Sequence, residues 1–379
     1  MTAMEKNNKT LNVPHLRFPE FSGEWVNKRM TDIAPLQRGF DLPTQEVEEG
    51  EYPVVYSNGI LRYHKTYKCE APGLVTGRSG SIGSFTFIGE GKYWPHNTSL
   101  WVTDFNKNHP LFIYYLYQTI NISQYASGSS VPTLNRNDVH RHSTNIPSLN
   151  EQIKIAALLE KIDKRIDTQK KIIEDLKKLK DAICNLNFTS GSSLTLGDIG
   201  YFVRGLTYSA SDVIDDTAGT AVMRSNNISN GDPVNFDELI WVNKTPNHDQ
   251  ILRAGDMVIC MANGSSALVG KSSYYINSEI ELATVGAFCG IYRSDNPLTK
   301  WLFQSTHYKK HLQRSIQGGN GAIANIYPED ILAISFNIPA DHERILNILN
   351  SLEEKYLLEY KLLCGYLGVK SHLLSQLFI

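Results

Sequence analysis

Three residues near the C-terminus come closest to a catalytic pattern. Glu353 and Lys355, with Asp341 upstream, have the residue types of a nuclease-like Glu-x-Lys sequence. They fall in a segment that is predicted to be helical, and residues two positions apart on a helix point in different directions. We therefore predict that these side chains lie in solvent and do no chemistry.

The sequence contains no stronger catalytic motif. Gly77, Gly80 and Gly83 have the spacing of a phosphate-binding loop, but no Gly-Lys-Ser/Thr follows them, so a nucleotide site is not indicated. The Asn-Pro-Pro-aromatic tetrapeptide of amino methyltransferases, the Walker sequence and the His-Glu-x-x-His motif do not occur. The histidines of the first half lack metal-ligand spacing. We expect a chain that is not an enzyme and that binds neither cofactor nor metal itself.

Loops rich in Gly, Ser and Asn carry the side chains best suited to binding. Their basic and amide groups can address phosphates and base edges of DNA. Any one loop is more simply an ordinary turn, but such loops recur at corresponding places in both halves, which favours a binding surface. They are TGRSGSIGS (76–84), GSSVPTLNRN (128–137), RSNNISNG (224–231), ANGSSALVGK (262–271) and GGNGAIAN (318–325).

A basic and aromatic strip surrounds His64. The segment LRYHKTYK, residues 61–68, interleaves basic side chains with two tyrosines. This alternation is typical of a strip that contacts nucleic acid. A solvent-exposed strand edge protected by lysines would give the same pattern, so both interpretations stay open.

Landmarks of the first half recur in the second. DIAPLQRG at 32–39 matches DIGYFVRG at 198–205, 166 residues later. HPL at 109–111 recurs as NPL before another aromatic segment, and the Ile-Pro pair at 146–147 recurs at 338–339. The common order indicates a tandem duplication of a globular domain followed by a long helix.

The globular parts have a mixed pattern. Short runs rich in β-branched and aromatic residues, bounded by Gly, Asn and Asp, predict strands. Examples are YPVVYS, GLVTG, GSFTFIG, SLWVTDF, GDMVICMA and GAFCGIYRS. One helix is predicted in each half, near residues 111–122 and 298–312. The fold class is therefore α+β, with two pseudo-repeated globular domains.

Each half ends in a long helix with a heptad seam. Residues 151–188 contain neither Gly nor Pro, and seam positions there and over 345–377 alternate in steps of four and three. We predict an intramolecular antiparallel coiled coil, with each helix packing only on its own domain as the alternative. The predicted interface consists of Leu159, Ile162, Ile166, Ile173, Leu176, Lys180, Leu352, Tyr356, Glu359, Leu363, Tyr366 and Leu373.

Polar residues in the two seams suggest a register. Matching every polar layer places Lys180 opposite Glu359 and Gln169 opposite Lys370. Full overlap of the helices would instead place Gln169 opposite Glu359. A buried polar layer can fix register at some cost in stability, which favours the first arrangement.

Composition sets limits on the protein as a whole. A length of 379 residues suggests two or three domains. The formal net charge of −2 excludes DNA binding by bulk basicity, so positive charge must be local or supplied by partners. Five scattered cysteines indicate a reducing compartment, and no segment reaches membrane-spanning length. We expect a cytoplasmic protein that has no contact with a membrane.

Together these features resemble the specificity subunit of type I restriction-modification systems. The order and spacing of short motifs carry the resemblance over essentially the whole chain. They are PHLRFPEFSGEW (14–25) ahead of Asp32-Ile33, GRSGSIGS (77–84), VPTLNRNDV (131–139) followed by Ile146-Pro147 and Glu151-Gln152, the Lys-rich central helix, and SHLLSQLF (371–378). The segment 14–25 has no counterpart in the second half.

The resemblance implies a non-catalytic role in a larger complex. In this family two target-recognition domains each read half of a bipartite, gapped sequence of double-stranded DNA, and the helices form the spacer. The helices also dock two modification subunits, which bind S-adenosylmethionine and methylate adenine. Restriction subunits, which use ATP and Mg, complete an endonuclease that acts against foreign DNA.

The resulting prediction has five segments: a disordered lead (1–13), a first recognition domain (14–147), a central helix (148–190), a second recognition domain (191–339) and a C-terminal helix (340–379). Predicted phosphate contacts are Arg38, Arg62, Lys65, Arg78, Arg136, Arg204, Arg224 and Lys271, and predicted loop and strip contacts are His64, Ser79, Ser129, Asn226, Asn227, Asn263, Ser265, Asn320 and Asn325. A coiled-coil scaffold without a DNA role and the recognition half of a nuclease-methyltransferase are the alternative functions.

Overall fold

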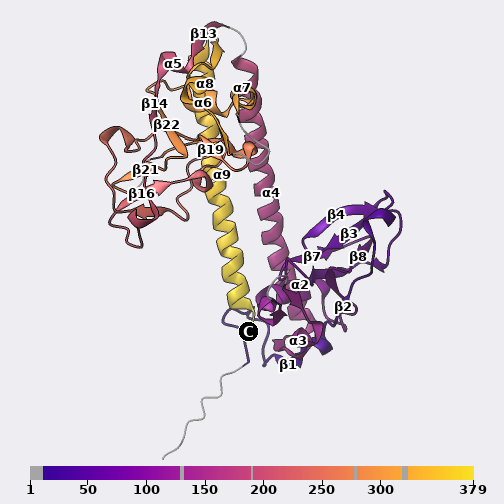
Figure 1. Ribbon diagram of the computed structural model, residues 1–379. Coiled ribbons are helices and arrows are strands. Elements are labelled where there is room, and N and C mark those ends of the chain that lie inside the picture. Colours follow the sequence, from indigo (N-terminus) through magenta and orange to yellow (C-terminus); the bar gives the residue numbers. More distant parts are fainter. Residues whose placement is uncertain (1–11, 129–131, 189–190, 277–279, 318–322) are drawn as a thin grey trace, which may run out of the picture. The chain divides into compact units, whose positions relative to one another are not determined.

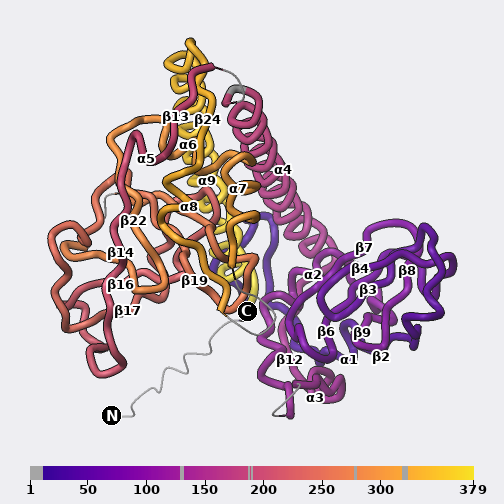
Figure 2. Tube along the Cα trace, turned by 45° about the horizontal axis from the view of Figure 1, so that its top comes forward, coloured from indigo at the N-terminus to yellow at the C-terminus, as the bar shows by residue number. Residues whose placement is uncertain are grey.

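The structure, a computed structural model, describes residues 12–128, 132–188, 191–276, 280–317 and 323–379. Helices and sheets occur together, in agreement with the α+β class (Figures 1 and 2). The chain divides into two compact units, one comprising the residues up to Lys170 together with Lys361–Ile379, the other Lys171–Tyr360. Both boundaries fall within the long helices α4 (Leu149–Asn187) and α9 (His342–Leu377), so each unit contains part of both helices.

Two four-stranded sheets form the first unit. One has the order β2-β9-β6-β7 and the other the order β4-β3-β8-β5. Small antiparallel pairs, β1 with β12 and β10 with β11, accompany them. The bounds are β1 Val26–Arg29, β2 Leu36–Arg38, β3 Tyr52–Tyr56, β4 Gly59–His64, β5 Cys69–Glu70, β6 Gly73–Gly77, β7 Phe85–Ile88, β8 Lys92–Pro95, β9 Ser99–Val102, β10 Ala126–Ser127, β11 Thr133–Leu134 and β12 Ser143–Ile146.

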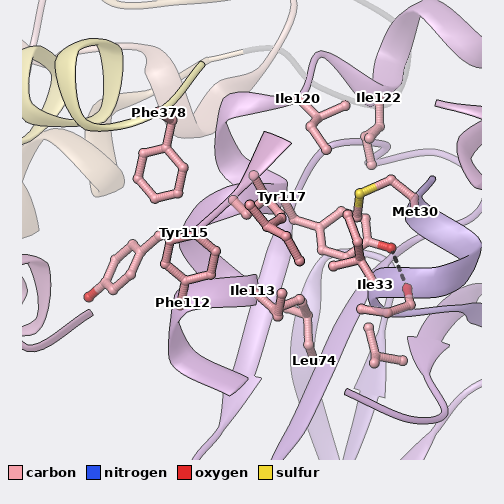
Figure 3. Close-up of a cluster of buried hydrophobic side chains, with 14 of the residues drawn as sticks. Met30, Ile33, Leu74, Phe112, Ile113, Tyr115, Tyr117, Ile120, Ile122 and Phe378 are labelled. Atoms are coloured by element: carbon pink, nitrogen blue, oxygen red, sulfur yellow. Dashed lines mark hydrogen bonds between the residues drawn. The ribbon is translucent and has the colours of Figure 1, made fainter. Parts of the chain in front are cut away.

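The core of the first unit is built around α2 (Pro110–Thr119). The helix starts where predicted because Pro110 suits its first turn and His109 Nδ1 accepts the Phe112 N–H as a cap. Phe112, Ile113, Tyr115 and Tyr117 of α2 are buried beside Met30 and Ile33 of α1 (Met30–Ile33), as Figure 3 shows. Phe378, just after α9, stacks on Phe112 with ring centroids 5.3 Å apart. The last helix therefore completes this core. A further short helix, α3 (Arg136–Arg141), follows β11.

The segment before β1 is fixed to the same unit. Arg17 donates hydrogen bonds from Nε and Nη2 to the Glu151 carboxylate, both at 2.8 Å. The Leu16 N–H donates to the Gln376 carbonyl at 3.0 Å, and Trp25 is buried in the core. These contacts join the aromatic lead to α4 and α9 within the first unit.

The second unit also contains two four-stranded sheets. Their orders are β14-β22-β18-β20 and β15-β17-β16-β21, and β13 pairs with β24 and β19 with β23. The strand bounds are β13 Ser192–Thr195, β14 Tyr201–Arg204, β15 Val213–Ile214, β16 Thr220–Met223, β17 Ile240–Val242, β18 Met257–Cys260, β19 Ala262–Asn263, β20 Ser272–Tyr274, β21 Ala283–Val285, β22 Cys289–Arg293, β23 Ala324–Asn325 and β24 Ser335–Ile338. Short helices α5 (Leu196–Ile199) and α8 (Pro328–Leu332) lie near the strand pairs.

The helix predicted at 298–312 is divided in two. It consists of α6 (Thr299–Gln304) and α7 (Thr306–Ser315), with Ser305 between them in an extended conformation. The Ser305 hydroxyl donates to the Leu302 carbonyl and accepts the Tyr308 N–H. This side chain ends one helix and caps the next, which propensity over a whole segment did not reveal.

Each unit contains an ion pair between α4 and α9, half-buried in the first unit and buried in the second. In the first unit, Lys370 lies 2.7 Å from Asp163, which also accepts the Tyr115 hydroxyl at 2.8 Å. In the second unit, Lys180 lies 3.1 Å from Glu353, which accepts the Tyr274 hydroxyl. The predicted register is wrong by six positions, since Lys180 meets Glu353 instead of Glu359. The observed pairs oppose charge to charge, whereas a Gln169–Lys370 layer would have opposed an amide to a charge.

Glu353 is also not the surface residue that we predicted. Its side chain is 7% exposed and contacts a second lysine, Lys300, at 3.1 Å. The predicted seam residues have no fully exposed member. Leu159, Ile166, Ile173, Lys180, Tyr356 and Leu363 are buried, and Ile162, Leu176, Leu352, Glu359, Tyr366 and Leu373 are half-buried.

Candidate nucleic-acid interface

A tight loop after β21 organises the predicted binding residues of the second unit. The Gly286 N–H donates to the Met223 carbonyl, and the Cys289 N–H donates back to the Gly286 carbonyl at 2.8 Å. The Phe288 carbonyl accepts the N–H groups of Met261 and Ala262. These bonds bring the ends of β16, β18 and β21 together.

A cavity of about 430 Å³ lies at this junction. Arg224 and Asn263, both predicted from the sequence, line it together. Asn263 Nδ2 donates to Ser225 Oγ at 3.2 Å, so its amide holds the loop. The Arg224 guanidinium makes no ion pair with any residue that the structure describes. The full lining is Tyr208, Arg224, Ser225, Ala262, Asn263, Gly264, Gly286, Ala287, Phe288, Cys289 and Ile323.

The first unit has the same backbone arrangement with different side chains. The His96 N–H donates to the Val55 carbonyl, the Ser99 N–H to the His96 carbonyl, and the Thr98 carbonyl accepts two N–H groups. His96 therefore occupies the place that Gly286 has in the second unit. Its ring lies on that of Tyr56, with centroids 4.2 Å apart. Side chains fill the first unit where the second is hollow.

Polar contacts surround the filled site. Asp41 accepts hydrogen bonds from Asn97 and Arg38, the latter at 3.2 Å. Burial lowers the pKa of His96, although the Leu42 carbonyl and Asp41 oppose that effect. The imidazole is therefore neutral near pH 7 and acts as a hydrogen-bonding group.

The floor of the cavity in the second unit is uncharged. Cys289 lies opposite Cys260 in the pairing of β22 with β18. The hydrogen bond with Cys260, together with burial, raises the pKa of the Cys289 thiol. A protonated thiol and neighbouring alanines leave the charge of this site at its rim, on Arg224.

The other predicted residues fall into two groups. Arg62, Lys65, Arg136, Arg204, Asn226 and Ser265 are exposed, and Arg78, Ser79, Lys271 and Asn325 are half-buried. Lys65 pairs with Glu48. Ser79 forms a bridge with Thr133, which places Arg78 and Ser79 beside the second polar loop. The predictions at Ser129 and Asn320 lie outside the described residues.

Two predicted contacts are instead part of the core. His64 is 5% exposed, with Nδ1 accepting the Glu48 N–H and its ring edge-on to Trp94. Asn227 is fully buried, and its Nδ2 donates to the carbonyls of Asn235 and Asp237. Their polar atoms hold loops in place and are not available to a ligand. The basic strip is therefore reduced to its exposed members.

Five lining residues lie outside the loops predicted to bind: Tyr208, Gly286, Ala287, Phe288 and Cys289. Phe288 and Ile323 are 64% and 55% exposed, among the more exposed large apolar side chains of the described residues. Ile323 falls within the predicted loop 318–325, whereas the sequence around Phe288 resembles an ordinary strand. Aligning the halves would have placed Gly286 opposite His96 and indicated a difference in volume there.

The described part of the chain lacks both the side-chain grouping of a metal site and a helix fit to span a membrane. It has no group of three or more His, Cys, Asp or Glu side chains placed to hold a metal ion. Nor does any helix within it have the length and apolar character needed to cross a bilayer.

Comparison with known proteins gives a consistent result. Residues 22–178 match the model of the type I restriction modification DNA specificity domain. The chain is 25% identical over 180 residues to the EcoprrI specificity subunit of Escherichia coli and 31% identical over 164 residues to the EcoKI specificity subunit of Escherichia coli K12. These alignments cover 46% and 40% of this chain but 44% and 33% of those relatives. The chain thus spans less than half the length of either one.

The fold agrees with these matches. The crystal structure of a type I restriction-modification system S subunit from M. genitalium superposes with a TM-score of 0.61 and 16% identity, covering 97% of this chain and 99% of that one. At that identity the likeness concerns the fold. Residues 22–178 of the chain thus match the model of the type I restriction modification DNA specificity domain, and the chain is similar to specificity subunits of type I restriction enzymes.

Proposed function

We propose that this chain is the DNA sequence-specificity subunit of a type I restriction-modification complex. Each unit reads one half of a bipartite, gapped target in double-stranded DNA. The long helices, packed as an antiparallel coiled coil, set the gap and dock two modification subunits. The chain itself catalyses nothing: S-adenosylmethionine belongs to the modification subunits, and ATP and Mg to the restriction subunits.

The matched backbone plan of the two units carries the proposal. Four backbone hydrogen bonds of the first unit each have a counterpart in the second. Phe40 N–H to Pro95 O corresponds to Leu206 N–H to Val285 O, and His96 N–H to Val55 O corresponds to Gly286 N–H to Met223 O. Ser99 N–H to His96 O corresponds to Cys289 N–H to Gly286 O, and Leu134 N–H to Arg78 O corresponds to Ile326 N–H to Met261 O. Two copies of one scaffold with different side chains at the same place are suited to reading two different half-sites.

The basic residues at these junctions support contact with DNA. Arg78 and Arg224 extend from strand ends, and Arg38 and Arg204 end the matched strands β2 and β14. Guanidinium groups bind phosphates and guanine edges. With a net charge of −2, local placement of these arginines is what would attract a polyanion.

The long helices have the dimensions and faces that the role requires. With 39 residues, α4 is about 58 Å long, more than one DNA turn of about 34–36 Å. On α9, Ile348, Leu362 and Val369 are exposed and spaced in multiples of seven, and the exposed Lys355 takes the position between the first two. Such a heptad row suits a partner helix. We assign this row to a helix of a modification subunit.

The function is tested by methylome mapping. Cells expressing the chain with its modification subunits are compared with cells that lack only the chain, using single-molecule sequencing. We expect methylated adenines in both halves of one gapped motif. An unchanged methylome, with the modification subunits shown to be present, would instead support a scaffold without a DNA role.

The docking surface is tested separately by co-purification. The Leu362→Asp variant should lose at least tenfold of the bound modification subunit, because a charge would be buried in the helix contact. Leu367→Asp is the matched control. Leu367 is equally exposed but lies about 140° around α9 from Leu362. Equal losses from both variants would contradict the assignment.

A further inference from the structure

The cavity of the second unit has the size and lining of a ligand site. Its volume of about 430 Å³ falls within the roughly 300–1,000 Å³ range of small-molecule pockets. Apolar and small residues form most of its wall, the Tyr208 ring lies along it, and Arg224 alone of its lining residues is charged. A flat, mostly apolar group with a hydrogen-bond acceptor on its edge would match this wall.

The mouth of the cavity carries two large apolar side chains. Phe288 and Ile323 both line the cavity and are more than half exposed. Proteins that unstack DNA insert such side chains between base steps. This unit therefore has a cavity next to exposed apolar side chains of the kind that insert between bases.

We propose that this cavity receives one base of the DNA target that leaves the duplex stack, while Phe288 fills the place that the base vacates. The inference rests on the proposed function and concerns the half-site read by the second unit. Tyr208 contacts a face of the extruded base, and Arg224 donates to a carbonyl oxygen on its edge, which excludes adenine, the one base without a carbonyl oxygen.

A base that stays stacked would use the site poorly. It presents only its edge to the protein, so the apolar floor around Ala262 and Cys289 would remain empty. An extruded base enters with both faces and replaces that void with contacts. The geometry therefore favours extrusion, and reading of a stacked edge is the competing outcome.

The first unit serves as an internal control. At the matched position His96 and Tyr56 occupy the space, with ring centroids 4.2 Å apart. We expect no unstacked base in the half-site that this unit reads.

Base-by-base probing of the complete modification complex tests the proposal. The chain with its modification subunits is bound to duplexes that carry its methylome-defined motif. Unstacking is measured with 2-aminopurine at each adenine, a fluorescent guanine analogue that keeps the O6 carbonyl at each guanine, permanganate reactivity at each thymine and pyrrolocytosine at each cytosine. The methylated adenines are left unaltered, since methyltransferases extrude their own target base. We expect a several-fold signal at one position, in one half-site only.

Cavity variants connect that signal to the site. Gly286→Leu places a side chain in the cavity, and its Cβ would lie 3.5 Å from Tyr208 and Val222, an ordinary contact distance. This variant should abolish the signal and reduce methylation of the native motif at least tenfold. Gly286→Ala, which leaves most of the cavity open, should retain both.

Two results would overturn the inference. One is specific methylation by the wild-type complex without an unstacked base outside the methylated adenines. The other is a Gly286→Leu complex that retains the signal and the motif. If Gly286→Leu fails to fold, Phe288→Ala keeps the cavity and should still lower the signal several-fold; an unchanged signal would count against insertion of Phe288. Absence of any specific methylation would instead refute the proposed function.

Discussion

The two units share a backbone plan and differ in what fills it. At one loop the first unit has His96 packed on Tyr56, and the second has Gly286 beside a cavity of about 430 Å³. The hydrogen bonds on either side are the same. The difference teaches that the scaffold is fixed by main-chain contacts, which leaves the side chains at the loop free to diverge. A recognition protein needs this separation of framework from contact surface.

A second comparison concerns the acid that joins α4 to α9 in each unit. The Glu353 carboxylate forms ion pairs with two lysines and accepts a hydrogen bond from the Tyr274 hydroxyl, and its side chain is 7% exposed. The Asp163 carboxylate forms an ion pair with Lys370 and accepts a hydrogen bond from the Tyr115 hydroxyl, and its side chain is 25% exposed. Both units thus have an ion pair between α4 and α9, and the pair is buried more deeply in the second unit.

Replacing Glu353 or Asp163 by alanine should give the largest losses of unfolding free energy, and the sizes of the two losses compare the two ion pairs. Glu353→Ala leaves Lys180 and Lys300 without their carboxylate in a buried site, so we expect the second unit to lose about 3–5 kcal/mol of unfolding free energy. Asp163→Ala should cost the first unit about 1.5–3 kcal/mol. Hydrogen exchange of α4 and α9 amides measures both. Equal losses would show that the deeper burial of Glu353 does not make its ion pair contribute more to stability than that of Asp163.

The glycines that follow β2 and β14 should come next. A Cβ on Gly39 would lie 2.1 Å from the His96 carbonyl oxygen, and on Gly205 it would lie 2.2 Å from that of Gly286. Alanine at either position should cost its unit about 1–3 kcal/mol, because backbone must move. Gly286→Ala is the control and should change stability by less than about 0.5 kcal/mol. Thermal unfolding of each variant checks the contrast.

Opening the filled site tests whether the ring pair supports the first unit. His96→Gly removes the ring that packs on Tyr56 and adds backbone freedom, so we expect a loss of about 1–2.5 kcal/mol. The loss should appear as faster hydrogen exchange in β3 and β8 and not in β16 and β21. Faster exchange in both units would contradict independent frameworks.

Mild acid should weaken the first unit more than the second. Burial lowers the pKa of His96, His109, His140 and His142 in the first unit and, among the described residues of the second, of His311, so folding favours their neutral forms. That contribution is present above the ordinary histidine pKa of about 6.5 and is lost as pH falls through the lowered values. Exchange corrected for intrinsic rates, compared at pH 7 and pH 5.5, measures the change. His96→Gln should remove part of it, and an unchanged drop would assign the effect to the other three histidines of the first unit.

Much of the framework was predictable because it rests on local patterns. The long helices were found within a few residues of α4 and α9, since their seams repeat over many heptads. The recurring Arg-Gly pairs at Arg38-Gly39 and Arg204-Gly205 mark positions where only glycine admits a neighbouring carbonyl. Arg224 and Asn263 were predicted to bind and do line one cavity.

The site itself could not be predicted in the same way. His64 and Asn227 were assigned to DNA by residue type, yet Trp94 covers the first and loop carbonyls hold the second. Phe288 carries no sequence signal, because an apolar residue at a strand end is ordinarily buried, and Ile323 was covered only as part of the predicted loop 318–325. Whether a side chain faces solvent depends on distant segments that cover it.

The sequence alone thus determined the α+β class, the long helices and the polar loops, since these follow from periodicity and residue type along the chain. Tertiary structure decided which acid meets Lys180, which predicted residues are buried, and that Gly286 leaves a cavity where His96 fills one. The reason is physical. Register, burial and empty volume are properties of surfaces that meet across the fold, and they depend on residues far apart in the sequence.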